Sequence, residues 1–507
     1  MTAPNVWYIR REVVDLLPQY QLIRDALAGE AKVKQKKDKY LPIPNSHNKN
    51  DSKVMARYLN YLARAVFYNV TRRTLAGLVG QVFMRDPQTN FPESEQFTAM
   101  VANVTGDGVT LDQLAAKAEG YGLAFSRGGL LTDYPTSESG FSVEQIRNGE
   151  AHPTIQLFSP FEIINWRFKQ VGAKTVLSLV VLVERRTYGD DGFEMKQSCM
   201  FRVLRLNDAG NYIQELYYED IPTDWNGEVM PKQGNYLLKE TFMPTGADSQ
   251  PLKAIPFEFF GSQNNDANPD NPNFYDLASL NMAHYRNSAD YEEACFITGQ
   301  PTPVVVGLDE NWYKNVMGGE INFGSNGGVP LPKEADFKLV QAEERTMLKE
   351  AMETKEKQMV ALGAKLVEQR DTQRTATEAG YDQAASDSVL VATTKNVSAA
   401  LTAALKNACI FTGDNPDDVE YILSTDFTLA TMAADELNAV MQTWQKGGIS
   451  FTEMRGRLRR GGLATQDDDE AKAEIDDQLA EQAARMAEQM ETEAKINGKA
   501  KPAPVGK

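Results

Sequence analysis

The stretch Phe274–Leu308, FYDLASLNMAHYRNSADYEEACFITGQPTPVVVGL, joins a polar helix to a short strand. Residues from Asp276 to about Gly299 have helical periodicity, and the apolar residues near one face are Leu277, Leu280, Tyr291 and Cys295. The polar residues that leave little of the helix apolar are Asn281, Asn287, Ser288, Glu292 and Glu293. A helix this polar is rarely stable unless neighbours pack on several sides. The segment QPTPVVVGL then ends the helix and predicts a strand.

A small β module and a second long helix follow this strand. Residues 318–341, GGEINFGSNGGVPLPKEADFKLVQ, are interrupted by Gly and Pro in the manner of short strands and turns. From Glu343 the chain is expected to be helical for about 27 residues, or roughly 40 Å at 1.5 Å per residue. The apolar stripe of this helix is Leu348, Met352, Met359, Leu362 and Leu366. The sequence therefore predicts a compact β module between two long helices.

A polar junction, EQRDTQRTATEAGYDQ (368–383), connects the second helix to a third. Thr375 and Glu378 have the spacing of a capping box, in which each side chain accepts the other residue's backbone N–H. The preceding helix should therefore end near Arg370, and DTQR should form an exposed link. The third helix, about 376–411, has one apolar side formed by Leu390, Val397, Leu401, Leu405 and Ala408.

The N-terminal half predicts helices followed by an antiparallel sheet. Helices are expected at 9–29, 52–79 and 111–125, with a basic loop between the first two that begins with Lys32, Lys34, Lys36, Lys37 and Lys39. That loop could contact phosphate, although a charge run is more often simply solvated. Strand patterns in 175–188, 200–207 and 212–219 are separated by GDDG and NDAGN turns, which predicts a meander. Ala254–Gly261 is expected to be one more buried strand.

The C-terminal region predicts a short basic helix and an acidic tail. Ser450 and Glu453 form a second expected capping box, in a helix that ends at Gly461-Gly462 and carries four arginines. Residues 467–493 hold eleven Asp and Glu against two basic residues, a net charge of −9. The other 480 residues therefore carry only −8 of the total of −17.

Composition restricts the class of protein. The 507 residues should divide into two to four modules, and the net charge of −17 argues against a wrapped, high-affinity nucleic-acid binder. Three scattered cysteines argue against a disulfide framework or a zinc site. The N-terminus lacks the apolar region of a signal peptide, and the longest aliphatic run, Thr175–Val183, is too short to span a bilayer. We expect a soluble intracellular protein without membrane contact.

Catalytic and nucleotide-binding motifs are missing from the sequence. It contains no phosphate-binding glycine loop, no G-x-S-x-G and no H-E-x-x-H. Of the three histidines, His284 lies on the polar helix, where a packed or solvated histidine is the ordinary expectation. Adjacent carboxylates such as Asp190-Asp191 are expected in turns. The sequence therefore predicts a structural protein with no catalytic residues, no metal and no cofactor.

From about Ala65 to Leu463, the chain resembles the portal proteins of tailed bacteriophages. Tyr68–Pro87, YNVTRRTLAGLVGQVFMRDP, looks like the family's early helix and its exit. Phe274–Leu308 is similar to the helix that enters the stem and then the clip. Residues 324–341, GSNGGVPLPKEADFKLVQ, resemble the return of the clip, and TATEA (375–379) resembles the start of the long helix after the tunnel loop. The order and spacing of these stretches carry the resemblance.

The resemblance implies an α+β portal-type fold that assembles into a ring, usually a dodecamer. It assigns the chain to a wing of helices and an antiparallel meander (1–275), a stem helix (276–300), a clip (301–342), a second stem helix (343–369), a tunnel loop (370–375), a long helix (376–412), a wing and crown base (413–466) and an acidic crown tail (467–507). The tail is short and charged, which argues against the extended helical barrel of some relatives. The polar stem helices would be flanked by copies from adjacent subunits.

The resemblance also implies partners and site residues. Such a ring sits at one capsid vertex of the virion, after assembly in the host cytoplasm. Double-stranded DNA passes through it without sequence specificity, and it contacts the terminase large subunit, head–tail adaptor or tail proteins, and the major capsid and scaffold proteins. The DNA-facing residues of the tunnel loop would be Arg370, Thr372, Gln373 and Arg374. Strand addition between subunits in the clip would involve Val304, Val305 and Val306.

Alternatives remain at this point. Arg370 and Arg374 could instead pair locally with Glu368, Asp371 or Glu378. The chain could be another ring-forming head–tail adaptor or a scaffolding virion protein without a DNA channel. A third hypothesis is that the chain is an enzyme of an unrecognised class.

Overall fold

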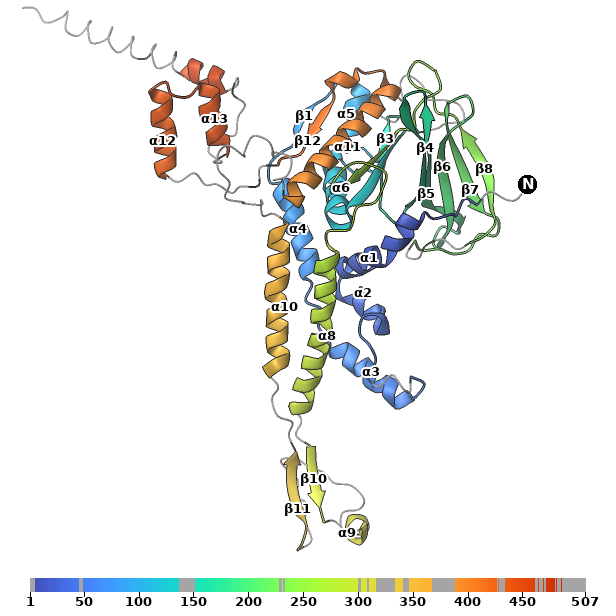
Figure 1. The fold of residues 1–507 in the computed structure, drawn as a ribbon, viewed down its shortest axis with the longest axis vertical. Coiled ribbons are helices and arrows are strands. Elements are labelled where there is room, and N and C mark those ends of the chain that lie inside the picture. The colour runs from blue at the N-terminus through green and yellow to red at the C-terminus, as the bar shows by residue number, and fades with distance from the viewer. Residues whose placement is uncertain are drawn as a thin grey trace, which may run out of the picture. The chain divides into compact units, whose positions relative to one another are not determined.

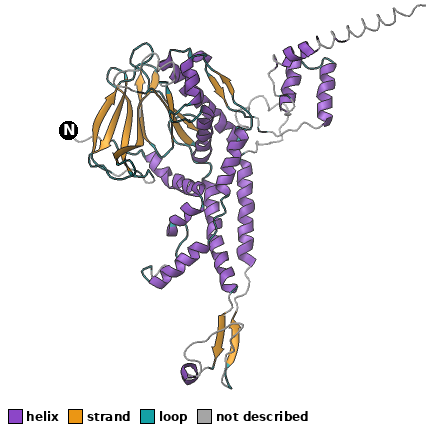
Figure 2. Ribbon diagram, turned by 180° about the vertical axis from the view of Figure 1, so that it is seen from behind, coloured by secondary structure: helices purple, strands orange, loops and turns teal. Residues whose placement is uncertain are grey.

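A computed structural model describes residues 5–44, 49–135, 151–227, 230, 233–299, 302–307, 310–315, 333–340, 346–366, 388–425, 427, 434–460, 464, 468, 471–478, 480 and 485. The chain divides into two compact units, Met1–Thr425 and Asp426–Lys507. The first unit combines helices with four small antiparallel sheets, and the second is helical where described (Figures 1 and 2).

The N-terminal helices are more broken than the sequence predicts. Helix α1 (Arg11–Ala28) matches the expectation, but the expected lysine loop contains α2 (Glu30–Gln35) and the 3-10 turn η1 (Lys37–Lys39). The single helix expected at 52–79 is two helices, α3 (Ser52–Arg64) and α4 (Val70–Val82). Two contacts explain the break. The Val66 N–H donates to Ser288 Oγ, and Asn69 caps α4 by accepting the Arg72 N–H.

Helix α6 (Leu111–Phe125) has the predicted bounds, and a capping box between Thr110 and Gln113 begins it. Before it lies α5 (Glu95–Ala102). The three predicted strands of the meander are β5 (Lys174–Asp190), β6 (Met195–Leu206) and β7 (Tyr212–Glu219). They are the middle of a five-stranded antiparallel sheet whose outer strands, β4 (Ile163–Val171) and β8 (Tyr236–Phe242), were not predicted.

A three-stranded sheet packs beside the meander. Its antiparallel strands are β3 (Thr154–Phe158), β2 (Arg127–Asp133) and β9 (Phe257–Gly261). Two further pairs join β1 (Gln88–Asn90) to β12 (Glu420–Ile422), and β10 (Thr302–Val306) to β11 (Asp336–Val340). The predicted buried strand before Gly261 is therefore present as β9.

The apolar run in β5 is continuous because both faces of this strand are covered. Val180 and Leu182 belong to a core cluster that also contains Trp166 of β4 and Phe257 of β9. The alternate residues of β5 point to the opposite face, where they join a second cluster around Phe201. Successive side chains of a strand face opposite sides, so two cores require an uninterrupted run of apolar residues.

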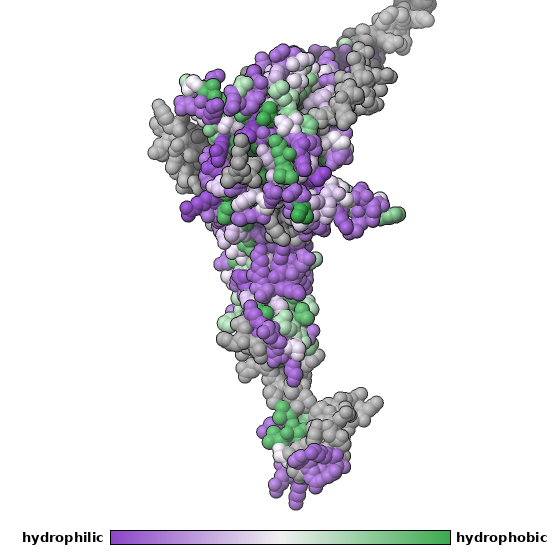
Figure 3. Space-filling model, turned by 90° about the vertical axis from the view of Figure 1, so that its right-hand side faces the viewer, coloured by the Kyte–Doolittle hydropathy of each residue, from purple (hydrophilic) through white to green (hydrophobic). Residues whose placement is uncertain are grey.

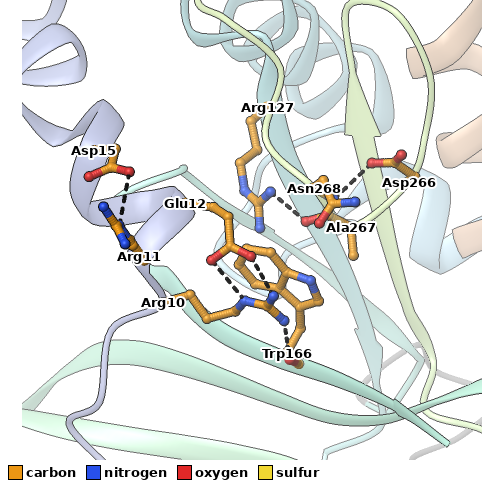
Figure 4. A network of polar contacts seen from close by, with 9 residues as sticks. All are labelled: Arg10, Arg11, Glu12, Asp15, Arg127, Trp166, Asp266, Ala267 and Asn268. Atoms are coloured by element: carbon orange, nitrogen blue, oxygen red, sulfur yellow. Dashed lines mark hydrogen bonds and ion pairs between the residues drawn. The ribbon is translucent and has the colours of Figure 1, made fainter.

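A network around Trp166 ties α1 to both sheets (Figure 4). The guanidinium groups of Arg10 and Arg127 each lie 4.4 Å from the Trp166 ring centroid. Arg10 also donates to the Trp166 carbonyl at 3.0 Å and pairs with Glu12 at 2.5 Å, while Arg127 donates to the Ala267 carbonyl at 2.6 Å. Arg127 is buried, and desolvation lowers its pKa to about 10.

The third long helix, α11 (Val389–Thr412), packs against α6, β2 and β9. It begins after the N-cap Ser388, and the part expected from 376 to 387 lies outside the described residues. The five apolar residues predicted for one side of this helix are all buried. At Gly122 of α6, a Cβ atom would lie 2.8 Å from Thr393 Cγ2, so a glycine allows the two helices to approach this closely.

The remaining elements are α8 (Tyr275–Thr298), α9 (Glu310–Asn315), α10 (Thr346–Lys365) and the 3-10 turn η3 (Pro416–Asp418). The second unit contains α12 (Ala434–Gln445) and α13 (Phe451–Arg460). Helices α8 and α10 lie side by side and run in opposite directions (Figure 1).

Candidate functional site

The polar face of α8 is buried inside its own chain. Asn281 is fully buried, and its Oδ1 accepts hydrogen bonds from the backbone N–H of Thr71 at 3.2 Å and from Thr71 Oγ1 at 2.9 Å. Its Nδ2 donates to the Tyr68 carbonyl at 2.8 Å. These bonds anchor α8 to the start of α4, and they satisfy a side chain that would otherwise destabilise a buried helix face.

The second half of α8 is held by α3 through a similar set of polar contacts. The Tyr61 hydroxyl donates to Asp290 at 2.6 Å. Glu293 lies between Arg64, which donates to it, and Arg57, whose Nη2 is 3.7 Å away. The Arg64 guanidinium also lies 4.1 Å from the ring centroid of Phe296.

These contacts correct one expectation from the sequence. We expected the polar residues of this helix to require packing by adjacent subunits, but Asn281, Ser288 and Glu293 already have partners in α3, α4 and the link between them. The buried face was also misplaced, because Cys295 is exposed while Asn281, His284 and Ser288 are buried. Their spacing of three and four residues puts the three on one face, and this spacing was the signal available in the sequence.

Helix α10 is covered on one side only. Among its described side chains, only that of Met359 is fully buried. Met347 and Val360 are each 68% exposed. The buried His284 of α8 has its Nε2 3.2 Å from Glu356 Oε1 of α10, which adds a polar link between the two helices. Thus α8 is packed on several sides and α10 on one.

The β10–β11 ribbon leaves apolar side chains exposed. The register pairs Val304 with Lys338, Val305 with Phe337 and Val306 with Asp336. Val304, Val306 and Phe337 are 36%, 52% and 39% exposed. Directly opposed residues of an antiparallel pair share a face, so Val304 and Val306 lie on one face and Phe337 on the other. In the described part of this module the sheet consists of these two strands, so within that part each strand has an edge without a partner.

The expected tunnel-loop residues lie outside the described part of the chain. These are Arg370, Thr372, Gln373 and Arg374, together with the expected cap residues Thr375 and Glu378. Most of the acidic tail is outside it as well. Ser450 and Glu453 are described, and both bonds of a capping box are present. The Glu453 N–H donates to Ser450 Oγ at 3.1 Å, and the Ser450 N–H donates to the Glu453 carboxylate at 2.9 Å.

Glu119 is a buried acid that the sequence did not point to. It lies on α6, fully buried, and its Oε1 accepts a hydrogen bond from the Thr394 hydroxyl of α11 at 3.0 Å. Its Oε2 has no hydrogen-bond partner. Desolvation raises the pKa of this carboxyl to about 8, against which the Thr394 bond acts weakly. A single acid on a helix has no pattern by which sequence alone could tell burial from exposure.

The described residues include neither a metal-ligand cluster nor a membrane-spanning helix. No group of three or more His, Cys, Asp or Glu side chains is placed there to hold a metal ion. Within the same part of the chain, no helix is both long and apolar enough to cross a membrane.

Comparison with known proteins gives a family match and a larger set of structural likenesses. The family described as "Domain of unknown function (DUF4055)" matches residues 273–412, the segment from α8 to α11. No curated protein matches the chain. The neck of an empty GTA particle, computed with C6 symmetry, is 14% identical, with a TM-score of 0.40 over 79% of this chain and 91% of that chain.

The neck of a native GTA particle, computed with C12 symmetry, is 12% identical, with a TM-score of 0.38 over 77% of this chain and 89% of that chain. Likeness at these TM-scores does not establish a common fold.

Proposed function

We propose that this chain is a structural protein of the head–tail junction of a phage-type virion and, more specifically, its portal. Copies would form a ring at one capsid vertex, with a central channel through which the genome is packaged and later ejected. The resemblance between Ala65 and Leu463 supports this assignment. So does the arrangement of two antiparallel helices, α8 and α10, separated in sequence by a small β ribbon (Figure 1).

The one-sided packing of α10 is the observation that carries the proposal. A helix of 20 residues with one fully buried described side chain has little apolar contact within its own chain. Most of the stability of protein helices comes from tertiary packing of an apolar face. In a ring, each α10 would meet the stem of the next copy, which would cover Met347 and Val360.

The β10–β11 ribbon supports assembly in the same way. An isolated two-stranded ribbon is marginally stable in water, and a third strand or another apolar surface is needed to stabilise it. Addition of a strand from a neighbouring copy would pair a free edge and cover Val304, Val305 and Val306. We propose these residues as the contact between subunits in the clip.

The charge of the chain suits a conduit. Phosphate attraction is steep and salt-dependent, so a strongly basic channel would hold DNA and prevent it from sliding. In a chain of net charge −17, a belt formed by Arg370 and Arg374 of each copy could steer or retain the duplex. Removing both arginines should leave ring yield unchanged and lower the DNA retained per particle. Loss of rings would instead indicate local pairing of these arginines.

The partners proposed for the ring are double-stranded DNA, the terminase large subunit, tail or adaptor proteins, and capsid and scaffold proteins. We propose no catalytic activity, metal or cofactor. These assignments follow from the resemblance and from the absence of catalytic motifs in the sequence.

Negative-stain electron microscopy of the purified chain tests the proposal. Rings with a central opening wide enough for a duplex are the expected result. Rings without such an opening would favour an adaptor, and monomers in every buffer would contradict both. Val305→Asp should prevent ring closure while the meander remains folded. Val171→Asp, at an exposed valine of β4, changes the same residue type outside the clip and should leave rings intact.

A further inference from the structure

A concentrated basic segment lies in a chain that is acidic overall. Residues 30–64 hold nine Lys and Arg against three Asp and Glu, a net charge of +6, so the rest of the chain carries −23. The nine cations are Lys32, Lys34, Lys36, Lys37, Lys39, Lys49, Lys53, Arg57 and Arg64. All nine are in the described residues, on or beside α2, η1 and α3. We name them the basic surface.

The folded chain brings the parts of the basic surface together. Lys34 Nζ donates to the Ala63 carbonyl at 3.0 Å, which ties α2 to the end of α3. The Tyr58 hydroxyl of α3 donates to the Leu41 carbonyl at 3.0 Å, and Lys49 is 3.7 Å from Asp38. The segment is therefore one folded patch, although the sequence alone allowed a solvated loop.

Two acids that pair with this surface, Asp25 and Glu293, are less exposed than Lys39 and Arg57 beside them. Asp25, 3.7 Å from Lys39, has a fully buried side chain, while that of Lys39 is 49% exposed. Glu293, between Arg57 and Arg64, is 16% exposed, whereas Arg57 is 62% exposed. At these two sites solvent meets Lys39 and Arg57 in preference to the carboxylates, whereas Glu30 and Asp38 are at least as exposed as Lys34 and Lys49, with which they pair. The net positive charge of the patch therefore comes from the excess of cations over acids.

The basic surface is separate from the α10 side of the stem. In both ribbon views, α8 lies between α10 on one side and α2 and α3 on the other (Figures 1 and 2). Figure 3 views the molecule from the side on which α2 and α3 project in Figure 1, and hydrophilic residues gather there below the sheets. A ligand on this surface would not touch the exposed residues of α10.

We propose that the basic surface binds the phosphate backbone of nucleic acid without sequence specificity, as a contact additional to any channel. Protein–protein interfaces are depleted in lysine and enriched in aromatic residues and arginine. Here all seven cations from Lys32 to Lys53 are lysines. Lysine is a compact point charge that suits phosphate, so this composition favours nucleic acid over an acidic protein.

Duplex binding by the full-length chain tests the inference. The probe is a short fluorescein-labelled duplex of arbitrary sequence, read by fluorescence anisotropy between about 50 mM and 200 mM salt. The test variant is Lys37→Glu with Lys53→Glu, two exposed lysines. Lys53 is in the first turn of α3, where an acid suits the helix dipole, so the variant should fold. The control is Lys169→Glu with Lys174→Glu, two exposed lysines of β4 and β5 with the same change in charge.

We expect the logarithm of the association constant for the duplex to fall linearly with the logarithm of the salt concentration. The test variant should bind more weakly, and the magnitude of this salt slope should be smaller by about 1.8 because two phosphate contacts are lost. The control should keep the wild-type slope. Equal weakening by both variants, or no duplex binding at about 50 mM salt, would overturn the inference. Binding of polyglutamate but not of the duplex would overturn it in favour of an acidic protein partner.

Two further measurements separate a loss of duplex binding from misfolding and from a change in assembly. Thermal unfolding checks that all chains fold, and Lys37→Gln with Lys53→Gln replaces the test variant if the reversal does not fold. Binding is measured on separated monomer and ring fractions. A chain that forms no rings would contradict the proposed portal while leaving duplex binding by the monomer measurable, because the basic surface belongs to a single chain.

Discussion

Helices α10 and α11 are similar in length and close in sequence, yet their environments differ. Thirteen residues of α11 are buried, against α6 and the strands β2 and β9. Among the described side chains of α10, Met359 alone is fully buried, and α8 is its main neighbour. Helix α11 is thus stabilised by its own chain, whereas α10 has an uncovered face that another copy could occupy.

The same difference separates the two kinds of sheet. Residues of β5 reach a core on each face of the meander. The β10–β11 ribbon has two strands and exposed valines. Mutations in regions stabilised within the chain should lower the free energy of unfolding of the monomer. Mutations in regions with an uncovered face should instead lower the yield of rings. This distinction can be tested by mutations in each region.

The largest effect is expected in α11. Leu401 is fully buried, so Leu401→Ala should lower the free energy of unfolding by about 2–5 kcal/mol, through lost burial and a residual cavity. Chemical denaturation of the monomer measures this change. Val360→Ala on the exposed face of α10 is the matched control. If the two substitutions destabilised the monomer equally, the contrast between the helices would be wrong.

The second effect concerns pH and the buried acid beneath α11. The pKa of Glu119 is raised from 4.5 to about 8, so between these values the folded chain retains a proton that the unfolded chain has lost. The contribution of this carboxyl to the free energy of unfolding is fully present below pH 4.5 and is lost as pH rises to about 8. At about 1.4 kcal/mol per pKa unit, the loss amounts to a few kcal/mol.

Glu119→Gln should remove this loss, because the amide does not ionise. Thermal unfolding of both chains across that pH range is the measurement, and the variant should gain relative stability as pH rises. Parallel pH profiles for the two chains would show that Glu119 does not titrate in this window.

A third effect tests how α8 is held. Asn281→Ala leaves the Thr71 donors and the Tyr68 carbonyl buried without their partner, which should lower the free energy of unfolding by about 1–3 kcal/mol. The monomer should show the loss, since all the partners belong to one chain. If only the ring lost stability, the packing of the polar face of α8 would depend on adjacent subunits.

The smallest effect on the monomer is expected on the open face of α10. Met347→Ser and Val360→Ser each change a side chain that is 68% exposed, so the free energy of unfolding should stay within about 0.5 kcal/mol. Ring yield by size exclusion should fall, because a ring would bury these residues. Unchanged ring yield would show that this face of α10 is not an interface.

Local patterns predicted the regular elements well where one physical signal dominated. Helix α6 has its predicted bounds because a capping residue begins it, and the meander follows from strands separated by turn residues. The apolar stripe of α11 also predicted its buried side, since a helix with five apolar residues on one face buries that face.

Predictions failed where polar contacts between distant residues decided the structure. The break between α3 and α4 depends on Ser288, more than 200 residues away, and the buried face of α8 depends on Thr71 and Tyr68. The expected tunnel loop and its capping box, Thr375 with Glu378, lie outside the described residues and stay predictions.

The alternation of helices and strands, the small β segment between two long helices and the separation of charge along the chain can therefore all be predicted from the residues alone. These features depend on local periodicity, turn chemistry and composition. Only the tertiary structure decided which polar residues are buried, which acid is neutralised by burial and which helix keeps an open face. Burial and hydrogen-bond satisfaction depend on pairs of segments far apart in sequence, so a local pattern can show which residues share a face but not what covers that face.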